Sequence, residues 1–337
     1  MSAPNPLNQS YAQLLTIRPW LADFFAALPL GAPGAAQSPE AWIQGLAGEA
    51  LAEAGLTRAG LLRQLGEFMA QMEAFSRPQS RGLRCLTLLG GRDKSGSPEE
   101  LHLEMRPGDV LCIVGPTGSG KSRLLGDIET LAQGDTPTGR RLLLDGMAPD
   151  EEARFSGERP LVAQLSQNMN FVMDLSVAEF IALHAESRLH ADVPGAVQQV
   201  FELAVGLAGE PFLLSTAVTA LSGGQSRALM IADVACLSDS PVVLIDEIEN
   251  AGVDRRRALD LLVKKEKIVL LATHDPLLAL LGERRLILRN GAVASVLATS
   301  PKERESLLKL DRLDRLLGRL REQVRAGERI DFDPSLF

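Results

Sequence analysis

Residues 115–122 read Gly-Pro-Thr-Gly-Ser-Gly-Lys-Ser, which fits the phosphate-binding pattern GxxxxGK[ST]. The apolar run 110–114 precedes this loop and a helical pattern over 123–131 follows it, so the loop connects a strand to a helix. Its glycines let consecutive backbone amides turn toward a phosphate, and the helix N-terminus adds positive potential. The sequence therefore predicts an α/β fold that binds a nucleotide through Gly115, Pro116, Thr117, Gly118, Ser119, Gly120, Lys121 and Ser122.

The loop and a second apolar run, 242–245, together predict the cofactors ATP and Mg²⁺. Lys121 is expected to reach the β- and γ-phosphates, and the Ser122 hydroxyl to bind Mg²⁺. The run 242–245 ends in two carboxylates, which alone could be a solvated strand end; their position after a phosphate-binding loop favours a catalytic role. Asp246 would then face the magnesium ion, and Glu247 would act as the general base for the attacking water.

The string Leu-Ser-Gly-Gly-Gln over 221–225 is another glycine-rich helix start that can bind phosphate. It resembles the signature of ATP-binding cassette (ABC) ATPases. The resemblance implies that this segment faces the γ-phosphate bound to a second copy, so that ATP joins two chains in a head-to-tail homodimer. The residues it assigns to nucleotide binding are Ser222, Gly223, Gly224 and Gln225.

Further elements of this family follow in family order, and the resemblance covers roughly residues 83–298. Gln167 resembles the Q-loop glutamine, a magnesium ligand, with Gln164 as the competing candidate. Asp254 ends a string that resembles the D-loop, and His274 resembles the switch histidine that contacts the γ-phosphate. The expected catalytic residues are therefore Glu247, His274 and Gln167, and the expected metal ligands Ser122, Gln167 and Asp246.

Two positions depart from the pattern of transport cassettes. No aromatic residue lies between Arg77 and Gly115, where many members of the family carry one that stacks on adenine. Arg92 stands at the matching offset and could stack on the base as a cation or be solvated, and both readings stay open. Residues 248–250 read Ile-Glu-Asn where transport cassettes usually have Pro-Thr. The longer string over 245–254, together with 226–232, resembles the soluble ATP-binding component of the methyl-coenzyme M reductase activation system and its bacterial relatives.

The patterns along the chain predict a small helical domain over 1–78 and a C-terminal helix and tail over 301–337, and the resemblance implies that 79–300 form an ABC ATPase domain. Helices are expected over 11–28, 41–54, 57–75 and 301–326, with Thr57 as an N-cap. The expected fold is an ABC-type P-loop NTPase with a RecA-like core, an antiparallel β subdomain and a helical subdomain. The expected strands cover 83–89, 101–105, 110–114, 141–145, 160–165, 242–245, 268–272 and a hairpin over 285–297 that turns at Asn290-Gly291.

The net charge of −8 argues against a nucleic-acid partner, and no run reaches the ~18 apolar residues of a membrane span. Three scattered cysteines suit reduced thiols and a cytoplasmic location. The expected function is a soluble ATPase that drives assembly, activation or remodelling of a client protein, which could be a metalloenzyme or another protein complex. The alternatives are the ATP-binding subunit of a transporter, paired with a membrane permease, and an ATP-gated binding module with low turnover.

Overall fold

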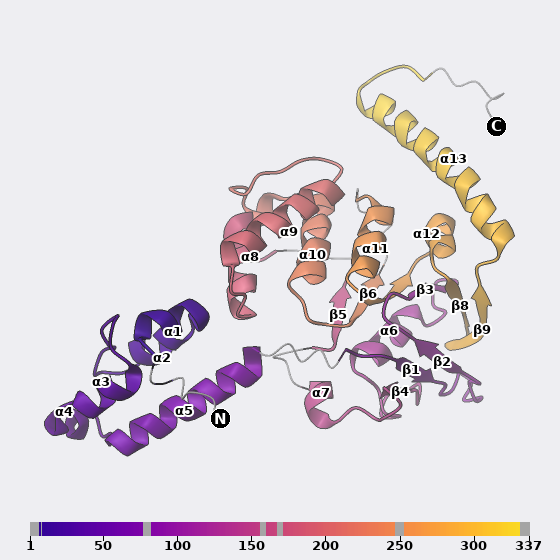
Figure 1. Cartoon of the computed structure of the whole chain (residues 1–337). Helices are drawn as coiled ribbons and strands as arrows, with labels where there is room; N and C mark the ends of the chain where they lie inside the picture. The colour runs from indigo at the N-terminus through magenta and orange to yellow at the C-terminus, as the bar shows by residue number, and fades with distance from the viewer. Residues whose placement is uncertain are drawn as a thin grey trace. The chain divides into compact units, whose positions relative to one another are not determined.

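Figure 1 shows the computed structural model of the chain, which describes residues 7, 9–76, 82–155, 160–166, 171–246 and 253–330. The chain divides into two compact units. The first comprises Met1–Gln79 and Ala182–Ala196, and the second comprises Ser80–Ile181 and Val197–Phe337. The grouping of Ala182–Ala196 with the N-terminal residues was not among the sequence predictions, which placed one boundary near residue 78.

The N-terminal part of the first unit is helical, as expected, but two of its predicted helices are each divided. The helix predicted over 11–28 is wrong because the chain leaves the helical conformation at Arg18 (φ −135°), the residue before Pro19. The helix predicted over 41–54 is interrupted by extended backbone at Leu46 and Ala47. The observed helices are α1 (Tyr11–Ile17), α2 (Leu21–Ala26), α3 (Pro39–Gly45), α4 (Gly48–Glu53) and α5 (Arg58–Ser76).

Aromatic side chains form the core of this helical part. Tyr11, Trp20 and Phe25 are buried, and the rings of Tyr11 and Phe25 meet edge to face with centroids 5.2 Å apart. Thr57 caps α5, because its Oγ1 accepts a hydrogen bond from the Gly60 amide at 3.1 Å.

Two sheets form the centre of the second unit. The antiparallel sheet has the order β2-β1-β4, with β1 (Leu86–Leu89), β2 (His102–Met105) and β4 (Arg141–Leu144). The other sheet has the order β5-β6-β7-β3-β8-β9, parallel except for the β8–β9 hairpin. Its strands are β3 (Val110–Val114), β5 (Val162–Leu165), β6 (Val242–Asp246), β7 (Ile268–Ala272), β8 (Arg284–Arg289) and β9 (Ala292–Ala298). All of these strands fall within the predicted segments or within one residue of them.

The remaining helices follow β3 along the chain, and Ala182–Ala196, which includes parts of α8 and α9, belongs to the first unit (Figure 1). These helices are α6 (Lys121–Glu129), α7 (Glu151–Phe155), α8 (Val177–Ser187), α9 (Val193–Leu207), α10 (Gly223–Cys236), α11 (Arg255–Lys264), α12 (Pro276–Leu281) and α13 (Pro301–Arg325). The last matches the helix expected over 301–326. Two leucines of this helix are partly exposed: the exposed fractions of Leu313 and Leu317 are 37% and 49%.

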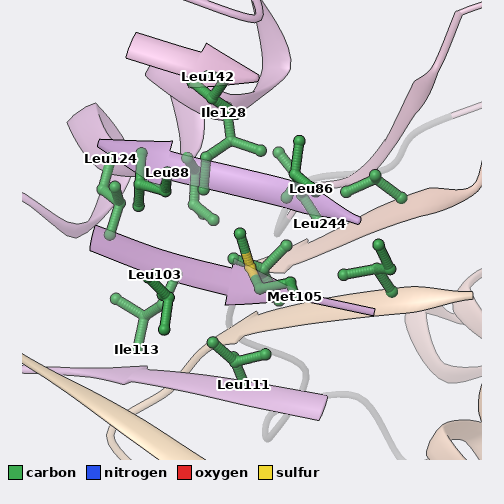
Figure 2. Packing of buried hydrophobic residues seen from close by; sticks show 14 of the residues in the cluster. Leu86, Leu88, Leu103, Met105, Leu111, Ile113, Leu124, Ile128, Leu142 and Leu244 are labelled. Carbon is green, nitrogen blue, oxygen red and sulfur yellow. The ribbon is translucent and has the colours of Figure 1, made fainter. Parts of the chain in front are cut away.

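Strand β3 is buried on both faces, because alternate residues point in opposite directions. Leu111 and Ile113 join the cluster between the two sheets and α6, which Figure 2 shows from close by. Val110 and Cys112 join a second cluster that includes residues of α10 and α11. Packing on both sides fixes the end of β3, where the phosphate-binding loop begins.

A fully buried arginine connects the two sheets to α6. The Arg140 guanidinium, 0% exposed, binds Glu99 through two hydrogen bonds of 2.8 Å and Asp127 through one of 3.0 Å. It also donates to the Gly291 carbonyl oxygen at 2.8 Å. Burial raises the pKa of Glu99, but hydrogen bonds from Arg140, Val293 and Gly91 outweigh that effect and hold the pKa below its ordinary value. Glu99 therefore stabilises the fold above its unfolded-state pKa of 4.5, and this contribution is lost as the pH falls below that value.

Removing this buried cation should destabilise the protein far more than removing the exposed cation next to it in the sequence, Arg141. We expect Arg140→Met to lower the free energy of unfolding by about 3–5 kcal/mol, because two carboxylates lose their buried partner. Arg141 begins β4 and is exposed, so Arg141→Met should change the free energy by no more than about 0.5 kcal/mol. Urea denaturation of both variants measures the difference, and equal midpoints would contradict the buried cluster.

Candidate nucleotide-binding site

The loop over 115–122 lies between β3 and α6, as the sequence predicts. Gly118 (φ 78°) and Gly120 (φ 107°) adopt left-handed backbone conformations that side chains with a Cβ rarely tolerate. Lys121 is the first residue of α6, and its Nζ donates to the Gly115 carbonyl oxygen at 2.8 Å. The lysine ammonium therefore lies over the loop at the helix N-terminus, where backbone amides and the helix dipole favour an anion.

The turn of the β8–β9 hairpin packs against the phosphate-binding loop and donates a hydrogen bond to it. The Gly291 amide donates to the Ser119 carbonyl oxygen at 2.8 Å, and a Cβ on Gly120 would come within 3.0 Å of the Gly291 Cα. The Ser119 Oγ is buried and has no hydrogen-bond partner within the part of the chain that the structure describes. A polar atom without a partner in a glycine-lined loop fits a phosphate ligand, so the residues present suit a bound nucleotide.

Lys94 is a second cation at the loop, and the sequence analysis missed it. Its Nζ donates to the Gly118 carbonyl oxygen at 2.6 Å, and its amide donates to the Asn290 carbonyl oxygen at 2.9 Å. Arg92, the residue proposed to meet adenine, is exposed and is held by its amide to the Thr138 carbonyl oxygen at 2.7 Å. The role of Arg92 stays a prediction. The turn Asp-Lys-Ser-Gly-Ser over 93–97 was the available signal for a structured loop here.

The strand register gathers the remaining candidates at one edge of the parallel sheet. Asp246, the last residue of β6, is paired with Ala272 of β7, which is paired in turn with Ile113 of β3. The carboxyl ends of parallel strands meet at the same edge. Asp246, the phosphate-binding loop and His274, exposed two residues beyond β7, therefore share that edge.

Two expected catalytic residues, Glu247 and Gln167, lie outside the described residues. Gln164, the competing Q-loop candidate, lies on β5. Its side-chain amide, oriented to donate, is 2.8 Å from the Glu129 carboxylate of α6. This contact gives Gln164 a partner within the fold.

The segment 221–225 begins α10 with a complete capping box. The Ser222 Oγ accepts a hydrogen bond from the Gln225 amide at 3.3 Å, and the Gln225 Oε1 accepts one from the Ser222 amide at 2.9 Å. Ser222 and Gly223 are exposed, and a Cβ on Gly223 would meet open space. The helix start is therefore rigid and accessible to a ligand carried by another molecule.

Asp254 begins α11 in the same way. Its Oδ1 accepts a hydrogen bond from the Arg257 amide at 3.1 Å, and its own amide donates to the Leu207 carbonyl oxygen at 2.9 Å. These contacts fix the second half of the segment that resembles a D-loop.

Comparisons with known proteins agree with this geometry. The family described as ABC transporter matches residues 98–250. An uncharacterized ABC transporter ATP-binding protein of Methanocaldococcus jannaschii is 50% identical over 247 residues, which cover 73% of this chain and 94% of the relative. This chain belongs to the ABC ATPase family.

Two more distant comparisons fit the same conclusion. The lipoprotein-releasing system ATP-binding protein LolD of Nitratidesulfovibrio vulgaris is 32% identical over 220 residues, covering 60% of this chain and 90% of LolD. A solved structure described as the ATP-binding subunit of an ABC transporter superposes with a TM-score of 0.50 at 20% identity, covering 69% of this chain and 99% of that structure. The ABC ATPase fold expected from the sequence is thereby confirmed. Within the described residues, no helix has the length and apolar character needed to cross a bilayer.

Adding one methyl group at Gly120 tests whether the conformation of the loop, rather than the stability of α6, determines the affinity for ATP. In Gly120→Ala the new Cβ would strain the backbone by about 1–3 kcal/mol and push against Gly291, so the loop amides should shift. We expect the affinity for ATP to fall by at least about tenfold. Gly126→Ala, in the same helix with open space around it, should raise stability by about 0.5–1 kcal/mol and leave ATP affinity unchanged. Calorimetric titration with ATP measures both, and equal affinities would contradict the proposed cradle.

Proposed function

We propose that this chain hydrolyses Mg-ATP between two copies of itself and transmits the resulting closure to a partner protein. The observation that supports this most is the register of β3, β6 and β7, which gathers the phosphate-binding loop, Asp246 and His274 at one sheet edge. That edge unites a phosphate cradle, a carboxylate for a metal ion and a histidine.

The chemistry follows from these positions. The loop amides and Lys121 hold the β- and γ-phosphates, and Ser122, Asp246 and Gln167 would hold Mg²⁺, which when bound neutralises charge on the phosphates. A water oxygen attacks the γ-phosphorus while the bond from this phosphorus to the bridging oxygen of ADP breaks. Glu247 accepts the proton of the water, and His274 donates a hydrogen bond to the γ-phosphate.

The second copy would complete the site through Ser222. This serine caps an exposed helix start whose backbone amides and dipole favour a negative ligand. Binding of the γ-phosphate of the partner copy at this helix start would make dimerisation depend on ATP. The head-to-tail arrangement then places two ATP molecules at the interface.

The partner protein is best sought among membrane permeases. The two relatives described above carry the names of ATP-binding proteins of an ABC transporter and of a lipoprotein-releasing system. These names favour the transporter subunit, the alternative in the sequence analysis, over the client-remodelling role placed first there. In this transporter reading the chain would pair with a membrane permease.

A client protein remains the second candidate because of the helical part that precedes the cassette. That part has its own core of buried residues, including Leu14, Leu21, Phe25, Ile43 and Leu65. A folded appendage can bind a partner independently of the cassette. The resemblance to the methyl-coenzyme M reductase activation component stays a prediction and belongs to this candidate.

Removing the general base should separate ATP binding from hydrolysis. We expect Glu247→Gln to bind ATP with nearly parental affinity but to hydrolyse it at least about 100-fold more slowly, because the amide accepts no proton from the water. Glu249→Gln, two positions away, makes the same chemical change and should retain parental turnover. Phosphate release under saturating ATP measures the rates; parental turnover in Glu247→Gln would overturn the assignment.

The same Glu247→Gln variant, crosslinked in cells in its ATP-bound state, identifies the partner. A permease recovered as the main ATP-dependent companion supports the transporter subunit. A non-membrane protein, lost when residues 1–78 are deleted, supports the client candidate instead.

A charge placed at the start of α10 should prevent dimerisation without unfolding the helix. Aspartate is a good N-cap, so Ser222→Asp keeps the capping interaction but repels the γ-phosphate of the partner copy. In the Glu247→Gln background this change should abolish ATP-driven dimerisation, whereas Ser222→Thr should preserve it. Sedimentation velocity with and without Mg-ATP gives the answer, and an undiminished dimer in Ser222→Asp would refute the shared site.

A further inference from the structure

One arginine joins the starts of α11 and α12 to α13. Arg255 is the first residue of α11 and directly follows Asp254. Its Nη2 donates to the Asp314 Oδ2 of α13 at 2.9 Å, and its Nη1 donates to the Asp275 Oδ2 at the start of α12. The three side chains are partly buried, with exposed fractions of 23% for Arg255, 16% for Asp275 and 35% for Asp314.

Asp275 directly follows His274, and its hydrogen bonds hold the segment that carries this histidine. Its Oδ1 accepts a hydrogen bond from the Leu277 amide at 2.8 Å, and its amide donates to the Thr273 Oγ1 at 3.0 Å. His274 lies between Thr273 and Asp275, which this hydrogen bond joins. A displacement of Arg255 would therefore change both the segment that ends in Asp254 and the segment that carries His274.

Ion pairs at two points link α13 to the cassette. Glu303, in its first turn, pairs with Arg285 of β8, and Asp314 follows about three turns later. Between these two points a cavity of about 230 Å³ separates α13 from α11 and α12, lined by Leu277, Leu281 and Leu307 among others. The ion pair between Asp314 and Arg255 lies at this cavity and ties the middle of the helix to the first residue of α11.

We propose that α13 controls the rate of ATP hydrolysis through Asp314, a positioning residue that holds Arg255 against Asp275. This inference rests on the proposed hydrolytic function. With Asp314 in place, Arg255 keeps the D-loop segment and the His274 segment in one arrangement. A change in the position of α13 would release Arg255 and slow hydrolysis, while the phosphate-binding loop would still bind ATP.

The test compares two aspartates on the same helix. Asp314→Asn should lower kcat about three- to tenfold and leave the KM for ATP within about twofold. Asp311→Asn makes the same charge change, but Asp311 pairs with Arg315 of its own helix, so turnover should stay parental. Asp314→Glu restores the carboxylate and should recover most of the rate. Mg-ATP-driven dimerisation, measured by sedimentation in the Glu247→Gln background, should weaken at least about threefold with Asp314→Asn alone.

The outcomes separate this inference from the function on which it rests. If the parent hydrolyses ATP and Asp314→Asn behaves like Asp311→Asn, the coupling through α13 is overturned and the ATPase assignment stands. If the parent does not hydrolyse ATP, the proposed function fails, and the inference that rests on it fails as well.

Discussion

The buried guanidinium of Arg140 is the interaction on which the shape of the nucleotide site depends. It binds Glu99 and Asp127, and neither carboxylate is more than 1% exposed. It also holds the carbonyl oxygen of Gly291, whose amide holds the carbonyl oxygen of Ser119 in the phosphate-binding loop. A continuous path of hydrogen bonds therefore leads from a buried charge to the loop that receives ATP.

This arrangement places one buried cation against two buried anions, which would be costly without further donors. Glu99 gains the amides of Gly91 and Val293, and Asp127 gains the Thr138 hydroxyl at 2.8 Å. The remaining oxygen of Asp127 has no partner within the described residues. The cluster therefore holds the loop in one geometry, but the burial of three charges lowers the free energy of unfolding that an apolar core would give. Such a cluster suits a ligand site that must be preorganised.

Much of the fold could be predicted from local patterns. The strands over 110–114 and 268–272 coincide with β3 and β7 because continuous apolar runs bounded by turns are typical of buried parallel strands. The hairpin turns at Asn290-Gly291, where both residues have positive φ, as that dipeptide favours. The undivided helix expected over 11–28 was wrong because Pro19 constrains the residue before it, a local effect that the apolar periodicity hid.

Contacts between distant residues could not be predicted in this way. An arginine at position 140 looks like a surface residue, and its partners lie 41 and 13 positions away in the sequence. Lys94 and Gly118 are separated by 24 positions, and nothing in the pattern around Lys94 indicates a carbonyl partner in the phosphate-binding loop. The motifs predicted the residues of the site, whereas the side chains that hold those motifs in place required the tertiary structure.

The central claim is that each ATP site combines the phosphate-binding loop of one copy with the helix start at Ser222 of another. It is tested most directly by mixing two inactive variants, Lys121→Ala and Ser222→Asp. In a mixed dimer one site would carry both substitutions, and the other would combine an intact loop with an intact helix start. The account predicts that neither variant hydrolyses ATP alone and that an equimolar mixture regains turnover. A mixture as inactive as its components, despite demonstrated mixed dimers, would contradict the shared site.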